Sequence, residues 1–419
     1  MLLHWIWLAH RSGVSDRMKI SLLEHFQDPE DIYFADAESF SHVKGLSAEA
    51  AEALKDKDLS DSQSVLEACR RARLHILTFR DAAYPSKLKN ISDPPILLYY
   101  KGQLPDLDSL PVIGVVGTRK ASAYGMQTAK RLGYQIAKCG GIVVSGMAYG
   151  IDAMAMSGAL TAGQMTVGVL GCGADLIYPQ SNRGLFRDVE AYGCILSEFP
   201  PGTQPAKWTF PKRNRIISGL SNGVLVVEAP ENSGALITAN CALEQGRDVF
   251  VVPGNIDQSG FVGSHRLLRD GAILVSSGWD VLSEYAALYP DKIIRDMTPS
   301  HQTVYPDELT KVSEKSEISP AKVAQKQSVP GKDMPLKKIL EKKSIDNQAS
   351  EAYSDVNTVL PKLSSEEQLI AEALRSGERL VDDVIAETGM TTGKILALLT
   401  MLELKGVVKR LPGKRIRLK

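Results

Sequence analysis

The stretch Val112-Ile113-Gly114-Val115-Val116-Gly117-Thr118-Arg119 decides the fold of this chain. Its first five residues are apolar or small enough for a short buried strand, and small and polar residues follow at once, as they do where a strand leads into a helix. A helical pattern over residues 127–138 comes next, and a second apolar run follows at 142–144. Strand, helix and strand in this order predict a βαβ unit.

The same alternation continues to about residue 285. It predicts a doubly wound, mainly parallel α/β sheet with helices on both faces. A further helix is expected at 236–245. The remaining strands are expected at 166–170, 195–196, 224–228, 249–252 and 273–275.

The chain on either side of this α/β domain, residues 81–288, has a different character. Residues 1–80 predict a helical domain with helices at 16–26 and 47–55, and the turn between them resembles that of a helix-hairpin-helix motif. A helical domain that only packs against its neighbour is the equally open alternative. Residues 289–361 contain no Phe or Trp and many Lys, Ser and Glu, which predicts a flexible linker. Residues 362–419 predict three helices and a small hairpin, the outline of a winged helix.

Composition and charge narrow the classes of function. The 419 residues carry 49 Lys plus Arg and 49 Asp plus Glu, so the formal net charge is zero. This balance disfavours a wholly basic chromatin-type protein and an acidic disordered one, but it permits a local basic patch. Five scattered cysteines without a C-x-x-C pair disfavour a disulfide scaffold or zinc ribbon. With no apolar run of about 18 residues, we expect a cytoplasmic protein without a membrane partner.

Small and polar residues follow several of the predicted strands. In a doubly wound sheet, ligands bind at the carboxyl ends of the strands, where helix N–H groups attract anions. We therefore expect an anion site at this edge. Asp152 and Glu228 also lie there and could bind a hydroxyl group, although Asp152 is expected to cap a helix. The expected site is formed by the loops that contain Gly117, Thr118, Arg119, Ser122, Ser145, Gly146, Ser233 and Thr238.

Several kinds of enzyme site lack their sequence patterns. Neither the G-x-G-x-x-G fingerprint nor the Walker motif is present. No metal-ligand spacing and no nucleophile–base pair is evident, and His265 is the single histidine of the α/β domain. We therefore expect no catalytic residue, metal or cofactor.

The segment Lys207-Trp208-Thr209-Phe210-Pro211-Lys212-Arg213-Asn214-Arg215 contains four cations, two aromatic residues and no acid. Distributed positive charge suits a phosphodiester backbone, and aromatic rings stack on unpaired bases of any sequence. The alternative is that Trp208 and Phe210 belong to the core and that Arg213 and Arg215 form salt bridges. At least one of these arginines is expected to be structural in either case.

The end of the chain, from Lys405 onward, contains seven cations and no acid. A basic wing of this kind suits DNA phosphates, although winged helices also dock proteins. The expected recognition helix, residues 392–404, carries Lys394 as its one cation, and base edges are usually read by Arg, Asn or Gln. A transcription regulator that reads a defined duplex sequence is therefore disfavoured.

Residues 80–285 resemble the DprA, or Smf, family of DNA-processing proteins. The resemblance rests on 117–125, 145–152, 210–217, 228–239, 246–247 and 252–254. This sequence departs from the usual family pattern at Met156, where the family generally has His, and at Ser264-His265, where an Asn is usual. Neither departure falls on an expected DNA contact.

The resemblance implies an extended Rossmann domain that binds single-stranded DNA, dimerises and has no catalytic activity. It also implies protection of incoming DNA and loading of RecA recombinase during natural transformation. Gly117 and Arg119 would hold phosphate, Ser145 and Gly146 would line the pocket, Lys207 would contact the backbone, and Phe210 would stack on a base. The expected wall of the pocket is made by Arg213, Asn214 and Arg215, and the expected binding set is completed by Thr118, Ser122, Ser233 and Thr238.

A nucleotide-processing enzyme is the second hypothesis. Residues 233–238 with Glu244 stand where phosphoribohydrolases of related Rossmann type have a glycine-rich phosphate motif. Glu244 is expected about two turns into its helix, too deep to reach a ligand easily. This reading also leaves the aromatic and basic segment without a role.

Overall fold

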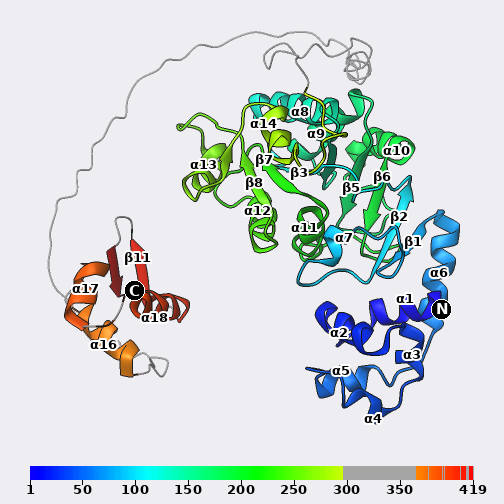
Figure 1. The fold of residues 1–419 in the computed structure, drawn as a ribbon, viewed down its shortest axis with the longest axis horizontal. Helices are drawn as coiled ribbons and strands as arrows, with labels where there is room; N and C mark the ends of the chain where they lie inside the picture. The colour runs from blue at the N-terminus through cyan, green and yellow to red at the C-terminus, as the bar shows by residue number, and fades with distance from the viewer. Residues whose placement is uncertain are drawn as a thin grey trace, which may run out of the picture. The chain divides into compact units, whose positions relative to one another are not determined.

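The computed structural model describes residues 1–295 and 365–418, apart from 376, 389, 391, 406 and 412–414 (Figure 1). The chain divides into two compact units, Met1–Ala321 and Lys322–Lys419. Most of the linker expected at 289–361 lies outside the described residues, as does the turn expected at Pro412-Gly413.

The first unit is built on a nine-stranded sheet with the order β1-β2-β6-β5-β4-β3-β7-β8-β9. Neighbours from β6 to β9 in this order pair in parallel, while β2 pairs antiparallel with β1 and β6, so the predicted mainly parallel sheet is confirmed. The strands β1 and β2 were not predicted, and β1 lies before residue 81, where the α/β domain was expected to begin. The strands are β1 (His75–Thr78), β2 (Leu97–Gly102), β3 (Val112–Val116), β4 (Ile142–Ser145), β5 (Thr166–Leu170), β6 (Cys194–Ser197), β7 (Gly223–Val226), β8 (Asp248–Val251) and β9 (Ile273–Leu274).

Helices cover both faces of this sheet (Figure 1). They include the long α8, α9, α11 and α12, and single 3-10 turns join some of them. The helices of this region are α7 (Ser86–Lys89), α8 (Ala123–Lys138), α9 (Ile151–Thr161), α10 (Arg183–Tyr192), α11 (Thr209–Leu220), α12 (Gly234–Glu244), α13 (Val262–Arg269) and α14 (Gly278–Leu282).

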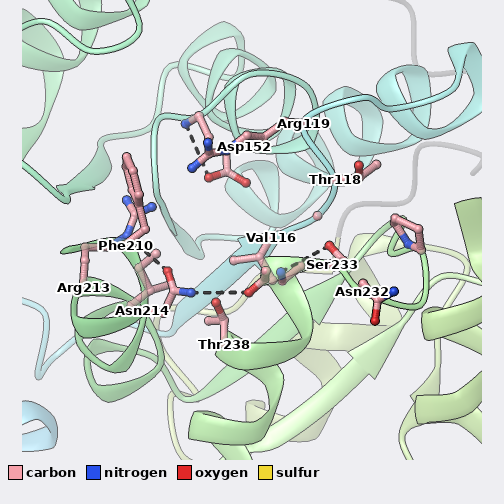
Figure 2. A pocket seen from close by; sticks show the side chains of 16 residues that line it. Val116, Thr118, Arg119, Asp152, Phe210, Arg213, Asn214, Asn232, Ser233 and Thr238 are labelled. Carbon is pink, nitrogen blue, oxygen red and sulfur yellow. Dashed lines mark hydrogen bonds between the residues drawn. The ribbon is translucent and has the colours of Figure 1, made fainter. Parts of the chain in front are cut away.

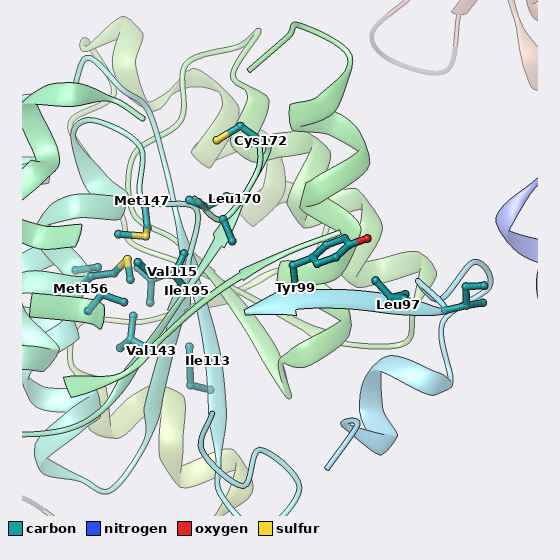
Figure 3. Close-up of a cluster of buried hydrophobic side chains, with 14 of the residues drawn as sticks. Leu97, Tyr99, Ile113, Val115, Val143, Met147, Met156, Leu170, Cys172 and Ile195 are labelled. Atoms are coloured by element: carbon teal, nitrogen blue, oxygen red, sulfur yellow. The ribbon is translucent and has the colours of Figure 1, made fainter. Parts of the chain in front are cut away.

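The alternation of side chains along β3 explains the two layers. Ile113 and Val115 join the core that is shared with α8 and α9 (Figure 3), while Val112 and Val116 join the core shared with α11 and α12. Successive residues of a strand point to opposite faces, so one apolar strand supplies both cores. Met156, where the family usually has His, is fully buried in the first core.

The N-terminal helices form the expected helical segment. The helix predicted at 16–26 begins after Ser15, which accepts a hydrogen bond from the Met18 N–H at 3.2 Å. The helix predicted at 47–55 begins after Ser47, which accepts from the Ala50 N–H at 3.1 Å. Both N-caps satisfy helix N–H groups that have no partner inside the helix. The helices are α1 (Leu2–His10), α2 (Asp16–Phe26), α3 (Pro29–Phe34), α4 (Ala37–Phe40), α5 (Ala48–Ala53) and α6 (Ser60–Ala72).

The C-terminal unit has the winged-helix pattern of three helices and a small sheet. Its strands are ordered β10-β12-β11, and Ile395, Leu399 and Ile416 belong to a core of their own. The predicted helices and hairpin are confirmed, and β10 adds a third strand. The elements are α16 (Ser365–Ala373), β10 (Arg379–Leu380), α17 (Val381–Thr388), α18 (Thr392–Leu404), β11 (Val408–Leu411) and β12 (Arg415–Leu418).

The described residues contain no helix that is both long and apolar enough to cross a membrane. Within the same part of the chain, no group of His, Cys, Asp and Glu is arranged to hold a metal ion. All five cysteines are free thiols, and four of them are buried.

Candidate nucleic-acid interface

A cavity of about 370 Å³ opens at the carboxyl ends of β3, β4 and β7 (Figure 2). The loop after β3, the start of α9, one side of α11 and the loop that leads into α12 surround it. The predicted loops are thus brought together at the expected edge of the sheet. The residues that line it are Val116, Gly117, Thr118, Arg119, Ala148, Asp152, Phe210, Arg213, Asn214, Ile217, Pro230, Asn232, Ser233, Gly234, Ala235 and Thr238.

Arg119 and Phe210 form the outer part of this cavity. Arg119 is exposed, and its guanidinium carbon lies 4.7 Å from the centre of the half-buried Phe210 ring. Tyr178 lies 5.8 Å from the same ring, centre to centre. A Cβ atom at Gly171 would come within 2.9 Å of the Phe210 ring, so the glycine after β5 allows this ring to lie close to the sheet. A cation stacked on an aromatic ring is a surface that suits a nucleotide.

Arg213 forms the inner wall and is almost completely buried. Its Nη1 donates to the Gly146 carbonyl at 2.9 Å and to the Val169 carbonyl. A Cβ atom at Gly146 would lie 2.5 Å from the guanidinium nitrogens, so this close approach needs glycine. Burial lowers the pKa of Arg213 to about 10, while Asp152 opposes this shift. At neutral pH Arg213 is therefore still a cation.

Asp152 holds the loop between β4 and α9. Its Oδ2 accepts hydrogen bonds from the N–H groups of Gly146 at 3.1 Å and Ala148 at 3.4 Å. The prediction that Asp152 caps a helix is wrong, because Gly150 occupies the N-cap position and the carboxylate turns back to the loop. Burial raises the pKa of Asp152, and Arg213 acts in the opposite direction.

The N-terminus of α12 closes the far side of the cavity. Ser233 is its N-cap and accepts a hydrogen bond from the Ala235 N–H at 3.3 Å. Asn214 donates to the Gly234 carbonyl at 3.4 Å, which joins α11 to this turn, and Thr238 lies on the cavity wall one turn further along. The partial positive charge of this helix end favours an anion in the cavity.

The predictions that Ser122, Ser145 and Gly146 line the cavity are wrong, because none of the three is among its lining residues. Ser122 is the N-cap of α8: it accepts from the Gly125 N–H at 3.0 Å and donates to the buried Glu228 carboxylate at 2.7 Å. Ser145 is fully buried and donates to the Val115 carbonyl at 2.6 Å. Glu228, expected near a ligand hydroxyl, therefore holds the start of α8.

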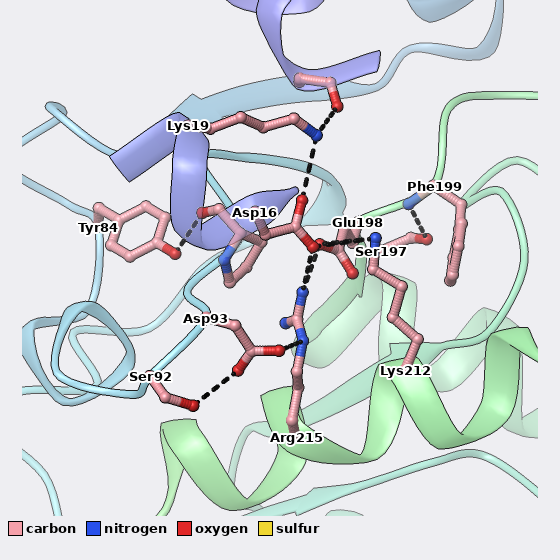
Figure 4. Close-up of polar contacts among 12 residues, drawn as sticks. Asp16, Lys19, Tyr84, Ser92, Asp93, Ser197, Glu198, Phe199, Lys212 and Arg215 are labelled. Atoms are coloured by element: carbon pink, nitrogen blue, oxygen red, sulfur yellow. Dashed lines mark hydrogen bonds and ion pairs between the residues drawn. The ribbon is translucent and has the colours of Figure 1, made fainter. Parts of the chain in front are cut away.

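Arg215 and Lys212 lie in a cluster of ion pairs on another side of α11 (Figure 4). Arg215 contacts Asp16 at 3.3 Å, Asp93 at 3.0 Å and Glu198 at 2.6 Å. Lys212 contacts Asp16 at 3.1 Å and Glu198 at 3.6 Å. The expectation that at least one arginine is structural is confirmed for Arg215, which does not line the cavity.

Lys207 and Trp208 precede α11 and are both exposed. The Trp208 side chain has 63% of its surface open to solvent, and Phe210 lines the cavity. The alternative that both aromatic residues belong to the core is therefore wrong. Lys207 lies outside the cavity lining, two residues before the first residue of α11.

Other lining residues had no sequence signal or only a weak one. Ile217 is an apolar helix residue whose facing direction depends on the position of α11. Asn232 lies in the polar turn immediately before Ser233, which was predicted. Extending the predicted site by one residue would have included Asn232. Tyr178 reaches Phe210 from a segment more than thirty residues away along the sequence, which no local pattern reveals.

The carboxylates do not form the acid–base pair that the nucleotide-processing hypothesis requires. Asp152 is the single carboxylate among the described residues of the cavity lining. Glu244 is the last residue of α12, about 15 Å along the helix from the end that faces the cavity. This geometry disfavours Glu244 as a group that acts on a ligand there.

Comparison with known proteins identifies relatives over the whole chain. Residues 75–286 match the family model described as DNA recombination-mediator protein A, and residues 357–414 match the DprA winged helix domain. Protein Smf from Synechocystis is 32% identical over 417 residues, which cover 98% of this chain and 97% of that protein. DNA processing protein DprA from Bacillus subtilis is 44% identical over 220 residues, covering 52% of this chain and 74% of that protein.

A solved structure agrees with these matches. The X-ray structure of DNA processing protein A from Streptococcus pneumoniae superposes with a TM-score of 0.60 at 35% sequence identity, covering 68% of this chain and 98% of that one. The matched residues contain every element that surrounds the cavity. The chain therefore belongs to the DprA (Smf) family of DNA-processing proteins, the DNA recombination-mediator protein A family.

Proposed function

We propose that the chain binds single-stranded DNA without regard to base sequence and passes it to RecA recombinase. The observation that carries the proposal is the exposed guanidinium of Arg119, stacked on Phe210 at the mouth of a cavity that α12 faces with its N-terminus. Arg119 and the helix end would hold a phosphate, and Phe210 would contact a base.

The shape of the site favours a single strand over a duplex. A cavity of about 370 Å³ has the size of a small-molecule site and suits one nucleotide. The bases of a duplex are paired and stacked, so they cannot reach Phe210 without being flipped out at a cost of a few kcal/mol. Lys207, exposed beside the cavity, would meet the backbone of the same strand.

A salt titration of the full-length protein tests this proposal. We expect single-stranded DNA to bind at least about tenfold more tightly than a duplex of the same sequence, with affinity that falls steeply as salt rises. The double variant Arg119→Glu, Lys207→Glu should lose most of this affinity. Lys138→Glu is the matched control, because Lys138 is an exposed cation at the end of α8, at the opposite edge of the sheet. Equal affinity for both DNA forms, or an unaffected double variant, would rule the proposal out.

Delivery of the strand to RecA is the second part of the proposal. Family membership supports it, and the described C-terminal unit supplies a second folded module for a protein or DNA partner. Adding the protein to single-stranded DNA coated with single-strand-binding protein should shorten the lag before RecA filaments form. An unchanged lag, with DNA binding intact, would remove this part alone.

We also propose a homodimer formed through the Rossmann domain. The strand β9 is an edge of the sheet, and both of its residues, Ile273 and Leu274, are exposed. An uncovered apolar edge of this kind is a surface for association. Leu274→Glu should shift sedimentation toward monomer, whereas Leu369→Glu, at a similarly exposed leucine of the C-terminal unit, should not. A monomeric unaltered protein would contradict the dimer.

A further inference from the structure

A cavity of about 690 Å³ opens among the N-terminal helices and shares no lining residue with the first cavity. One wall of this N-terminal cavity comes from α2, and the other comes from the turn between α4 and α5. Arg17 and Lys44 line it, together with His25 and His42. Glu24 is the one carboxylate among its described lining residues, so the cavity carries a net positive charge.

The side of α2 in this cavity is polar. Arg17, Ser21 and His25 follow one another four positions apart and therefore lie on one face of the helix. Leu22 and Leu23, on the opposite side, are buried in the core. Packing of α2 against the core thus turns the polar face outward, where it forms the wall of the cavity.

The two cations of the cavity have no protein partner. Arg17 and Lys44 are exposed, and within the described residues neither forms an ion pair or donates a side-chain hydrogen bond. The next cation along α2 is different, because Lys19 contacts Asp16 at 3.1 Å. Exposed cations that no carboxylate neutralises create a local positive potential, which attracts anions from solution.

The turn at residues 43–46 brings Lys44 to the cavity. It is the turn whose sequence resembles that of a helix-hairpin-helix motif. The Leu46 N–H donates to the Val43 carbonyl at 3.2 Å, and Gly45 has a φ of +80°, which favours glycine. A Cβ at the exposed Gly45 would meet no described residue within 4 Å beyond its chain neighbours. A phosphate group can therefore approach the backbone of this turn closely.

Ion pairs join α2 to the helix that borders the first cavity (Figure 4). Asp16, the first residue of α2, contacts Lys212 at 3.1 Å and Arg215 at 3.3 Å, and both cations belong to α11. Arg17 follows Asp16 directly, so their Cα atoms are about 3.8 Å apart. Phe210 of the first cavity is in the first turn of the same α11. These contacts hold the N-terminal cavity near the start of α11.

We infer that the N-terminal cavity is a second site for the same single strand, where Arg17, Lys44 and the backbone at Gly45 hold its phosphates. The inference rests on the proposed function, which supplies the strand. Phosphates are alike at every nucleotide, so this site adds affinity without base preference. Glu24 stands seven positions after Arg17, about 10 Å along α2, and lowers the affinity of the site for phosphate.

Strands of two lengths test the inference on the full-length protein. The short dT4 occupies the first cavity with little strand to spare, whereas dT30 is long enough for both sites. Affinities are measured by fluorescence anisotropy across a salt series. Arg17→Glu, Lys44→Glu should bind dT30 about tenfold more weakly and reduce the slope of log affinity against log salt by about 1 to 1.5, because two phosphate contacts are lost. Its affinity for dT4 should change less than about twofold.

Arg70→Glu, Arg71→Glu is the matched control. Both arginines are exposed on α6, form no ion pair within the described residues and lie outside the lining of the N-terminal cavity. The two double variants change the net charge equally, and at about 0.1 M salt exposed charges more than about 10 Å apart are screened. The control should therefore bind dT30 as the unaltered protein does. Unchanged dT30 binding in Arg17→Glu, Lys44→Glu, or an equal loss in both double variants, would overturn the inference.

A duplex of 30 base pairs distinguishes the kind of DNA that the cavity serves. Arg17→Glu, Lys44→Glu should weaken dT30 at least as much as this duplex. A loss confined to the duplex would assign the cavity to duplex DNA and overturn the inference.

Glu24→Gln gives a test that expects a gain. It removes the negative charge from the lining, so dT30 should bind about threefold more tightly. Glu67→Gln, at an exposed glutamate of α6 outside the cavity, should have no effect. Equal or weaker binding of dT30 by folded Glu24→Gln would contradict the inference.

Arg119→Glu, Lys207→Glu separates this inference from the proposed function, because it should weaken dT4 and dT30 alike. Loss of dT30 in this variant, with full binding in Arg17→Glu, Lys44→Glu, would remove the second site and leave the single-strand assignment standing. Binding of neither strand by the unaltered protein would remove both.

Discussion

Arg213 and Arg215 stand two positions apart in α11 and therefore point to different sides of the helix. Arg213 lines the first cavity, while Arg215 is held by three carboxylates. Their sequence context is the same, so both were predicted to lie at the pocket wall. Asp16 lies 199 residues away from Arg215 along the chain, and no local sequence pattern predicts their ion pair.

Replacement of Arg215 tests its structural role. Arg215→Ala would remove the buried cation that contacts both Glu198 and Asp16 and leave the more exposed Lys212 as the cation that they share, so we expect a loss of about 3 kcal/mol in the free energy of unfolding. Urea denaturation measures this loss. Lys212→Ala, which removes a more exposed cation from the same cluster, should cost less than about 1 kcal/mol. Equal effects would contradict the assignment.

His10 predicts a pH dependence of stability. Burial, with smaller contributions from Lys19 and Lys212, lowers its pKa from 6.5 to about 4. Below about pH 6.5, His10 therefore takes up a proton in the unfolded chain, whereas in the folded chain it does so only near pH 4. The free energy of unfolding thus falls as the pH decreases across this window. Because more than a third of the His10 surface is open to solvent, water screens this effect, and the contribution to the free energy of unfolding is about 1 kcal/mol or less.

His10→Gln isolates this effect, because Gln can keep the contact that His10 Nε2 makes with the Tyr99 hydroxyl at 2.7 Å. Denaturant midpoints of both proteins are compared between pH 7.5 and 4.5. The unaltered protein should lose more stability than His10→Gln over this range. Parallel curves would show that His10 does not titrate as described.

At the scale of elements, the strands β3 to β9 and the helices α2, α5, α8 and α12 were predicted, whereas β1, β2 and α11 were not. A short apolar run such as 112–116 indicates a buried strand, and a serine such as Ser47 caps the helix that follows it. Both patterns involve residues that are close in the sequence, so a single sequence is enough to predict them. The segment 209–220 has Pro211 and several cations near its start and lacks a clear apolar period. Proline is tolerated in the first turn of a helix, and the buried side of α11 includes polar residues whose partners come from other elements.

The position of Ser122 at the start of α8 leads to a prediction that separates two roles. Ser122→Ala removes the N-cap and one donor to buried Glu228, so we expect a loss of about 1–3 kcal/mol in stability. Because Ser122 does not line the cavity, affinity for single-stranded DNA should change less than about twofold once the protein is folded. Chemical denaturation and anisotropy on the same sample check both parts, and a large loss of affinity alone would restore Ser122 as a contact.

At the scale of the whole molecule, the formal net charge is zero, but the charged residues are distributed unevenly along the chain. In the C-terminal unit, Lys394, Lys405 and Arg415 pair with Glu366, Glu367 and Glu378. Lys409 and Arg417 lie opposite each other on neighbouring strands and are exposed. The basic end of the sequence is thus partly neutralised within its own unit, a detail that the pattern of charges did not reveal.

The two units have separate cores, and this predicts independent unfolding. No residue of the C-terminal core belongs to either core of the sheet. A protein cut after residue 295 should therefore keep the main thermal transition of the full chain within about 2 °C, since both cores of the sheet remain complete in it. Differential scanning calorimetry of both proteins measures this, and a markedly lower transition in the shortened protein would show that the units depend on each other.

The ion pairs around Arg215 also constrain how the sequence can drift over time. Asp16, Asp93, Glu198 and Arg215 come from four separate segments, and loss of any one leaves a charge with fewer partners. A relative that replaces Arg215 by a neutral residue should therefore carry compensating neutral residues at the acidic positions. Statistical covariation among these four sites, stronger than between Arg215 and its sequence neighbours, would be the evolutionary trace of this arrangement.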